Sequence, residues 1–295
     1  MHPEPFETFI APARRRAELW RLALGIGVIV IVYLSSIAML WLLAGVLAAW
    51  SGLGATPDPA TLAQSPVAVL LVIFSFLGMM LGVAAAVRIV HRRAVGTLFG
   101  ARGRLRRDFG FGAAVILAAF VVAMALWPGR AELVAGTPWR LWLMLLPLAL
   151  IGLAIQTAAE EMLFRGYLQQ QLAARFRSAL VWMLLPSALF GLLHYEPVVM
   201  GGNVWLVVAA TGLFGLVAAE LTARSGSLGL AWGLHFGNNA VALLLVSAGT
   251  GLEGLALYRL PAGEDHEAVL RPLILGDMAV MAALWGICRW WLRGR

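Results

Sequence analysis

The sequence has no lysine, a single cysteine and few charged residues of any kind. Charged residues make up 13% of the 295 residues, against roughly 25% in a soluble domain. This deficit excludes an ordinary water-soluble fold. All 22 basic residues are arginines, and they occur in short clusters between apolar segments. The net charge of +7 therefore does not indicate binding to nucleic acid.

Two further features are missing from the chain. With Cys288 as the single cysteine, no intrachain disulfide can form. No cleavable signal peptide is evident, because the first apolar stretch, residues 22–50, is too long for the apolar part of a signal sequence. What the chain has in abundance is hydrophobic residues, which make up 61% of it. Together these features predict an integral membrane protein.

Long apolar runs predict the fold class. A helix needs about 20 apolar residues to cross a bilayer core of about 30 Å. Non-helical single segments do not span a bilayer, because lipid offers the backbone no hydrogen-bond partners. We expect an all-α polytopic membrane protein, a single membrane-embedded domain over residues 1–295, with about eight transmembrane helices and a buried polar cavity. The predicted helices are 22–49, 66–90, 111–127, 140–159, 179–195, 203–221, 227–248 and 272–292.

Arginine placement predicts the orientation of these helices. Arginine clusters precede the first predicted helix, follow the second, fourth and sixth, and end the chain. With eight helices, all of these clusters fall on one side, which is the cytoplasmic side under the positive-inside rule. We therefore expect both termini in the cytoplasm and the protein in a bacterial inner membrane. Roughly the first dozen residues are polar and contain prolines, and we expect a short flexible lead there.

The few ionisable residues inside or beside the apolar segments are candidates for function. A charged side chain at the centre of a membrane helix costs about 2.5–3.5 kcal/mol on insertion scales. Glu220 lies four residues before Arg224, and we interpret it as part of an interfacial ion pair. The other candidates are Glu160 and Glu161 with Arg165, then His194, and then His235 with Asn238 and Asn239.

Helix spacing separates the two adjacent glutamates. Glu161 and Arg165 are four residues apart with the acid first, which is the favourable order for an ion pair on one helix face. Glu160 lies about 100° further round the helix and is left available. A structural interpretation stays open at this point, in which both glutamates cap a helix end in the headgroup region.

His194 is the predicted partner of Glu160. Arg177 lies 17 residues after Glu160 and 17 residues before His194, so a helical hairpin that turns near Arg177 places the two side chains at similar depth. A carboxylate and an imidazole at one depth can act as a general-base pair. His235 and Asn239 are four residues apart, and two N–H donors on one helix face can hold a developing oxyanion. The structural alternative for these groups is hydrogen bonding between helices.

Three short patterns follow one another along the chain: Glu160-Glu161-x-x-x-Arg165, Phe190-x-x-x-His194 and His235-x-x-x-Asn239. In this order they resemble the EExxxR, FxxxH and HxxxN/D motifs of the CAAX protease and bacteriocin-processing (CPBP, or Abi) family. The stretch ARSGSLGLAWGLHFGNN is also similar to that family's approach to its last motif. The resemblance covers about residues 140–248, which we take as the catalytic core.

This resemblance implies an intramembrane endopeptidase, a hydrolase similar to the type II CAAX prenyl proteases. Carried over to the matching positions, Glu160 activates a water molecule that His194 helps to position. The resemblance likewise implies that His235 and Asn239 stabilise the tetrahedral oxyanion. The substrate would be a peptide or protein in contact with the lipid bilayer. Removal of a leader peptide, or cleavage of a membrane-protein tail, is the natural expectation for a bacterial source.

Glu161 and Arg165 would support the site, and two alternatives stay open beside this hypothesis. Glu160, His194 and His235 could instead bind zinc, giving a zinc-dependent, metalloprotease-like variant of the same protease. The resemblance favours a metal-free glutamate mechanism, so we expect no cofactor. The second alternative is a non-enzymatic scaffold or a transporter-like protein that uses the polar cluster. Transporters often contain two related halves, and the sequence shows no such repeat.

Overall fold

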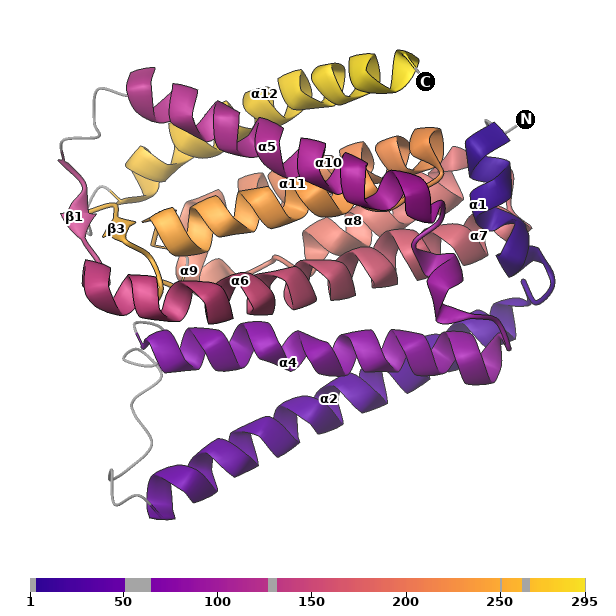
Figure 1. Ribbon diagram of the computed structural model, residues 1–295, viewed down its shortest axis with the longest axis horizontal. Coiled ribbons are helices and arrows are strands. Elements are labelled where there is room, and N and C mark those ends of the chain that lie inside the picture. The colour runs from indigo at the N-terminus through magenta and orange to yellow at the C-terminus, as the bar shows by residue number, and fades with distance from the viewer. Residues whose placement is uncertain (1–3, 51–64, 127–131, 250, 262–265, 295) are drawn as a thin grey trace.

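A computed structural model describes residues 4–50, 65–126, 132–249, 251–261 and 266–294, and the fold is helical almost throughout (Figure 1). The helical elements are α1 (Glu4–Arg14), α2 (Leu19–Trp50), α4 (Pro66–Ala85), η1 (Ala86–Val90), η2 (Val95–Leu98), α5 (Arg102–Leu126), α6 (Trp139–Glu161), η4 (Met162–Gln169), α7 (Gln170–Arg175), η5 (Leu180–Leu184), α8 (Leu185–Leu192), α9 (Pro197–Met200), η6 (Gly201–Asn203), α10 (Val204–Ser225), α11 (Gly229–Ala240), η7 (Val241–Leu245) and α12 (His266–Arg293). Several of these follow one another without a break, so that α6, η4 and α7 form one long helix.

Three strands of two residues each form a small sheet: β1 (Val134–Ala135), β2 (Val246–Ser247) and β3 (Tyr258–Arg259). Their order is β1-β3-β2, with β1 antiparallel and β2 parallel to β3. The expected all-α class is confirmed apart from this sheet. The sheet joins loops at one end of the bundle (Figure 1). Strands of two residues are too short to give a recognisable pattern in the sequence.

Six helices in the described part of the chain are long and apolar enough to cross a membrane. Leu180–Leu192 is a shorter apolar helix, and α11 with η7 covers only Gly229–Leu245. Every predicted hydrophobic segment overlaps a helix, and the protein is an integral membrane protein. The count of eight spanning helices stays a prediction.

Three predicted helices extend well beyond their expected bounds, in each case because polar residues belong to the helix. The helix predicted over 140–159 continues to Arg175, since Glu161 and Arg165 pair inside it. α5 begins at Arg102 rather than at 111, so arginines expected in a loop lie on its first turns. Their long side chains can reach the membrane surface from there. α12 begins at His266 rather than at 272. Residues 51–64, between the first two predicted helices, lie outside the described residues.

The N-terminal residues form a helix and not the expected flexible lead. In α1, Phe6, Phe9, Ile10 and Ala13 are buried, at the spacing of one helix face. This face packs against α7 and α10, and the ring centroid of Phe6 lies 4.7 Å from that of Trp182. Because polar residues and prolines lie between these positions, the sequence does not show the apolar face clearly.

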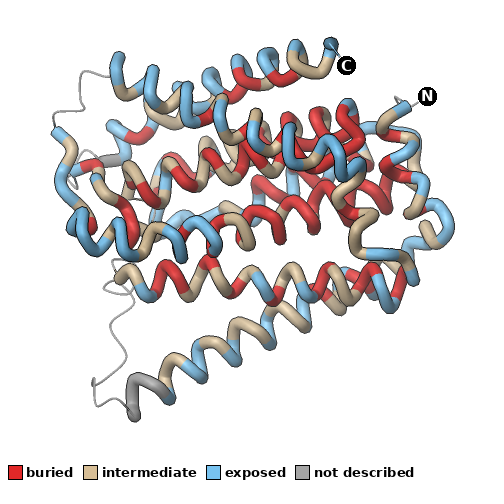
Figure 2. The backbone as a smooth tube through the Cα atoms, viewed as in Figure 1, coloured by how far each residue is buried: buried red, intermediate tan, exposed pale blue. Residues whose placement is uncertain are grey.

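Both termini lie at one end of the bundle, opposite the small sheet (Figure 1). The helices that end there carry arginine in their last turn, namely Arg175 of α7, Arg224 of α10 and Arg293 of α12. The assignment of this end to the cytoplasm stays a prediction. Buried residues concentrate on the central helices, whereas α2 is largely exposed along its length (Figure 2). The core therefore lies among the central helices, and buried residues of α1, α4 and η1 pack into it.

Glycines bring α5 and α11 into backbone contact. Gly229, Gly233 and Gly237 are spaced by four residues along α11, and each lies against α5. A Cβ atom at Gly233 would come within 2.2 Å of the carbonyl oxygen of Phe109. Small residues at this spacing are typical of close helix pairs in membranes. Because the contact fixes the rotation of α11, it also fixes the direction in which His235 points.

Gly233→Ala is therefore expected to destabilise the protein. Alanine is normally better than glycine in a helix, by about 0.5–1 kcal/mol, but the added methyl group meets backbone that cannot move aside. We expect a net loss of about 1–3 kcal/mol, measured as a lower Tm in detergent. The control is Gly110→Ala on α5, where a Cβ atom meets nothing within 4 Å. An equal Tm for the two variants would contradict this packing.

Candidate active site

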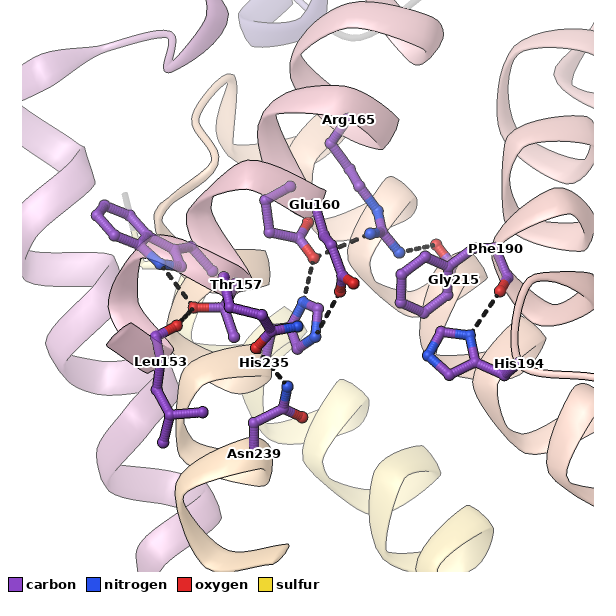
Figure 3. A network of polar contacts seen from close by, with 12 residues as sticks. Leu153, Thr157, Glu160, Arg165, Phe190, His194, Gly215, His235 and Asn239 are labelled. Atoms are coloured by element: carbon purple, nitrogen blue, oxygen red, sulfur yellow. Dashed lines mark hydrogen bonds and ion pairs between the residues drawn. The ribbon is translucent and has the colours of Figure 1, made fainter. Parts of the chain in front are cut away.

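A connected group of polar side chains lies in the interior of the bundle (Figure 3). Glu160 and Glu161 are the last two residues of α6, and His235 comes from α11. Glu161 and His235 are buried, and Glu160 is only slightly exposed. The two glutamates therefore do not cap a helix end at the headgroups, because the helix continues for 14 residues after Glu161, through η4 and α7.

The predicted ion pair of Glu161 and Arg165 is present. Nη1 of Arg165 donates to Oε1 of Glu161 at 2.9 Å, and both side chains are almost completely buried. Nη2 of Arg165 donates to the carbonyl oxygen of Gly215 at 3.3 Å. The guanidinium carbon lies 4.8 Å from the ring centroid of Phe190 and 5.4 Å from that of Phe214. These contacts from three helices hold Arg165, and Arg165 in turn holds Glu161.

His235 lies between the two carboxylates. Its Nδ1 is 2.8 Å from Oε1 of Glu161, and its Nε2 is 3.2 Å from Oε2 of Glu160. A neutral imidazole has one N–H and can donate to only one of these oxygens. The second contact needs a further proton, on either Nε2 or Glu160. Glu160 and His235 are thus placed to share one proton, while Glu161 keeps the ring in position.

Glu160 retains unused hydrogen-bonding capacity. Its Oε2 atom is buried and accepts no well-aligned hydrogen bond from any described residue, in spite of its closeness to His235. Buried carboxylate oxygens normally have donors. This oxygen is therefore a position where a water molecule or a group of a substrate can bind.

The sequence predicts a contact between Glu160 and His194, but the described residues show no such contact. The hairpin does turn between Arg175 and Leu180, as expected. Equal residue counts on its two arms imply equal depth only for regular α-helices, and π-helical segments η4 and η5 interrupt both arms. His194 also lies beyond the end of α8 at Leu192. The histidine that reaches Glu160 is His235.

His194 instead borders a small cavity of about 90 Å³, together with His235, Asn238 and Asn239. Its Nδ1 lies 2.8 Å from the carbonyl oxygen of Phe190 (Figure 3). A carbonyl oxygen only accepts, so this contact requires the proton on Nδ1. In the neutral ring Nε2 is then an acceptor. The structure thus brings the second and third motifs to one cavity.

Asn239 is held by a residue that the sequence did not single out. Its Nδ2 donates to Oε1 of Gln156 at 2.9 Å. Gln156 is buried on α6, one turn before Glu160. The sequence does contain a signal for Gln156: it is a polar amide inside an apolar run, four residues before Glu160. A second missed contact joins the same two helices, in which Trp232 donates to Thr157 at 3.1 Å.

Glu220 forms the predicted pair with Arg224. It also accepts a hydrogen bond from Nε1 of Trp285 at 3.1 Å and lies 3.8 Å from Arg289. Both of these residues belong to α12. Glu220 therefore connects α10 to α12 and is not part of the polar cluster around Glu160.

A buried histidine outside the spanning helices has a structural role. Nε2 of His91 lies 2.9 Å from the hydroxyl oxygen of Tyr167, and its Nδ1 lies 3.0 Å from the carbonyl oxygen of Arg16. Burial lowers the pKa of His91, which keeps its ring neutral at physiological pH. The contact ties the residues after η1 to η4, the segment that follows the two glutamates.

The three residues considered as zinc ligands are not grouped as a metal site among the described residues. In the described ranges, no three His, Cys, Asp or Glu side chains are grouped so that they could hold a metal ion. Glu160 and His235 are in contact, but no contact among the described residues joins His194 to either of them. We therefore derive no chemical step that uses a metal.

Residues 137–241 match the family model of the type II CAAX prenyl endopeptidases of the Rce1-like kind. This segment is an Rce1-like domain. It contains all three motifs, from Glu160 to Asn239, and the resemblance drawn from those motifs is confirmed. The match supports a membrane protease of the CAAX protease type, which acts on peptides in contact with the bilayer.

The similarity to other proteins extends beyond the Rce1-like domain. The chain is 29% identical over 254 residues to the uncharacterized protein YyaK of Bacillus subtilis (strain 168), and the alignment covers 84% of each chain. This length includes helices outside residues 137–241. No solved structure matches the chain significantly.

Proposed function

We propose that this protein is an intramembrane endopeptidase in which Glu160 activates a water molecule to hydrolyse a peptide bond. Its substrate is a membrane-associated or leader-type peptide. The main support is the buried contact of Glu160 with His235, beside the cavity that His194 and Asn239 border. Peptide hydrolysis needs a base, a positioned water and donors for the oxyanion. These side chains can supply all three.

Glu160 is the general base in this proposal. Its Oε2 atom takes a proton from water while the water oxygen bonds to the substrate's carbonyl carbon. His235, 3.2 Å away, shares this proton and keeps it in the site. The proton then passes to the nitrogen of the leaving amine as the carbon–nitrogen bond breaks. Glu161 and Arg165 act through His235, whose ring they orient.

His194 and Asn239 are proposed to hold the water and the oxyanion. With its proton on Nδ1, His194 offers Nε2 as an acceptor for a hydrogen of the water. Asn239 donates one amide hydrogen to Gln156 and has a second hydrogen for the developing oxyanion. His235 was the other oxyanion donor expected from the sequence. Because both of its ring nitrogens face carboxylates, we assign it to the proton instead.

Peptide cleavage is expected to survive the removal of divalent metals. The base is a carboxylate that needs no bound metal, and the candidate ligands do not converge. The measurement is cleavage by purified protein after chelator treatment, with the metal content determined on the same sample. Activity that disappears with the metal and returns with stoichiometric zinc would contradict the glutamate mechanism.

The proposed function is tested by comparing protein termini in membranes of wild-type cells and Glu160→Gln cells. We expect a small set of new termini, at or near apolar segments, that disappears in the variant. Cells with Glu220→Gln serve as the control and should keep the same termini, since Glu220 lies outside the cluster. Identical termini in all three strains would contradict a protease. Ion flux through liposomes that depends on Glu160, without any cleavage, would favour the transporter-like alternative.

A further inference from the structure

Asp277 is an acidic residue near the middle of α12, an apolar helix long enough to span a membrane. It lies outside the Rce1-like domain and outside the three motifs. A carboxylate at such a position is costly, because lipid does not solvate its charge. No described residue forms a hydrogen bond or an ion pair with it. The chain itself therefore does not offset the cost of this charge, which makes Asp277 a candidate for contact with a ligand.

Asp277 borders the catalytic cavity. The cavity of about 90 Å³ that contains His194 and His235 also has Asp277 and Asn238 in its wall. These two residues come from different helices, α12 and α11. Asp277 is thus at the depth of the proposed chemistry, although it comes from a part of the chain that the family match does not cover.

Asp277 and Asn238 also border a second, larger hollow. This is a groove of about 480 Å³ between α5, α11 and α12, and its other walls are apolar, with Ile116, Phe120 and Leu273 among them. α5 and α12 are outer helices of the bundle (Figures 1 and 2). Because the groove and the catalytic cavity share Asn238 and Asp277, these residues mark the place where the two hollows meet.

The charges around the two hollows select what can bind there. No arginine borders either of them within the described part of the chain. The apolar walls fit an apolar segment of a peptide. A carboxylate without a partner in low dielectric favours a cationic group. The occupant with both properties is a membrane peptide that has a basic residue next to an apolar stretch.

We propose that Asp277 is a specificity-determining residue that binds a lysine or arginine side chain of the substrate. The apolar part of the same substrate lies in the groove between α5, α11 and α12. This inference rests on the proposed peptidase function and narrows its substrate class to apolar membrane peptides with a basic residue a few positions from the scissile bond. Asn238, at the same junction, hydrogen-bonds to the peptide backbone.

The test measures peptide binding separately from cleavage. The full chain carrying Glu160→Gln is kept in detergent micelles, and two fluorescent apolar peptides are compared that differ only in arginine or citrulline, its neutral analogue. We expect the arginine peptide to bind about tenfold more tightly. Adding Asp277→Asn should remove this preference and leave the Kd of the citrulline peptide unchanged. Glu220→Gln, a carboxylate outside the groove, is the control and should retain the preference.

A charge reversal completes the experiment. With Asp277→Arg, a peptide with glutamate in place of arginine should bind more tightly than the arginine peptide. The inference is overturned if the arginine preference survives Asp277→Asn, if both peptides weaken equally, or if neither peptide binds. Cleavage of the arginine peptide by the wild-type protein is measured alongside. Its absence would contradict the proposed function, whereas the binding preference of the Glu160→Gln protein tests Asp277 alone.

Discussion

Glu160→Gln is expected to lower kcat for peptide cleavage by about 10²–10⁴-fold, the usual contribution of a general base. Glutamine has almost the same shape but cannot take a proton from water. The fold should survive, because the amide can still contact Nε2 of His235 and no longer carries a partly buried charge. The measurement is cleavage by purified protein in proteoliposomes, with the Tm of each sample determined in parallel.

The control for this prediction is Glu220→Gln, which removes a carboxylate from another helix of the same protein. It should change kcat by less than about twofold, since Glu220 contacts Arg224 and α12 and not the site. A Glu160→Gln protein that cleaves within about tenfold of the wild-type rate would show that another group is the base.

Arg165→Met is expected to cost about 3–5 kcal/mol of stability, because it leaves the buried charge of Glu161 without its partner. The substitution also removes the contacts of the guanidinium with the Gly215 carbonyl oxygen and the ring of Phe190. Unfolding by denaturant in detergent micelles measures this loss. Activity should fall as well, since Glu161 holds the ring of His235.

A double variant separates lost charge balance from lost packing. Glu161→Gln combined with Arg165→Met removes both charges and should recover part of the stability, because replacing a whole buried pair is often close to neutral. The exposed Glu220–Arg224 pair gives the matched control, and Arg224→Met should cost less than about 1 kcal/mol. If Arg165→Met costs no more than Arg224→Met, the buried pair does not support the fold.

Local spacing in the sequence predicted those contacts that stay within one helix. Glu161 with Arg165, and Glu220 with Arg224, are both four residues apart and both paired. Such contacts depend only on the geometry of one turn. The hydrophobic runs likewise located the helices, because the length of a span is set by the bilayer.

Contacts between helices were predicted less well. The partner of Glu160 is His235 rather than His194, because helix rotation and not residue count decides which side chains meet. That rotation follows from Gly229, Gly233 and Gly237, which set α11 against α5. Their spacing of four is visible in the sequence and is the signal that was overlooked. The π-helical segments beside the site carry no comparable signal.

Asp277 was not among the candidate residues drawn from the sequence. The cost of an intramembrane charge, which selected Glu160, applies equally to Asp277. Asp277 belongs to no motif, and only the fold places α12 against the cavity of the other candidate residues. The proposed substrate site therefore extends beyond the three motifs.

The central claim is that Glu160 activates water, and single-turnover cleavage in H₂¹⁸O tests it most directly. The substrate is a peptide identified from the comparison of membrane termini, with wild-type protein in excess so that each molecule reacts once. We predict one ¹⁸O atom in the new carboxyl terminus from this first turnover. A first-turnover product without ¹⁸O, whose oxygen must come from a protein carboxylate, would contradict the claim.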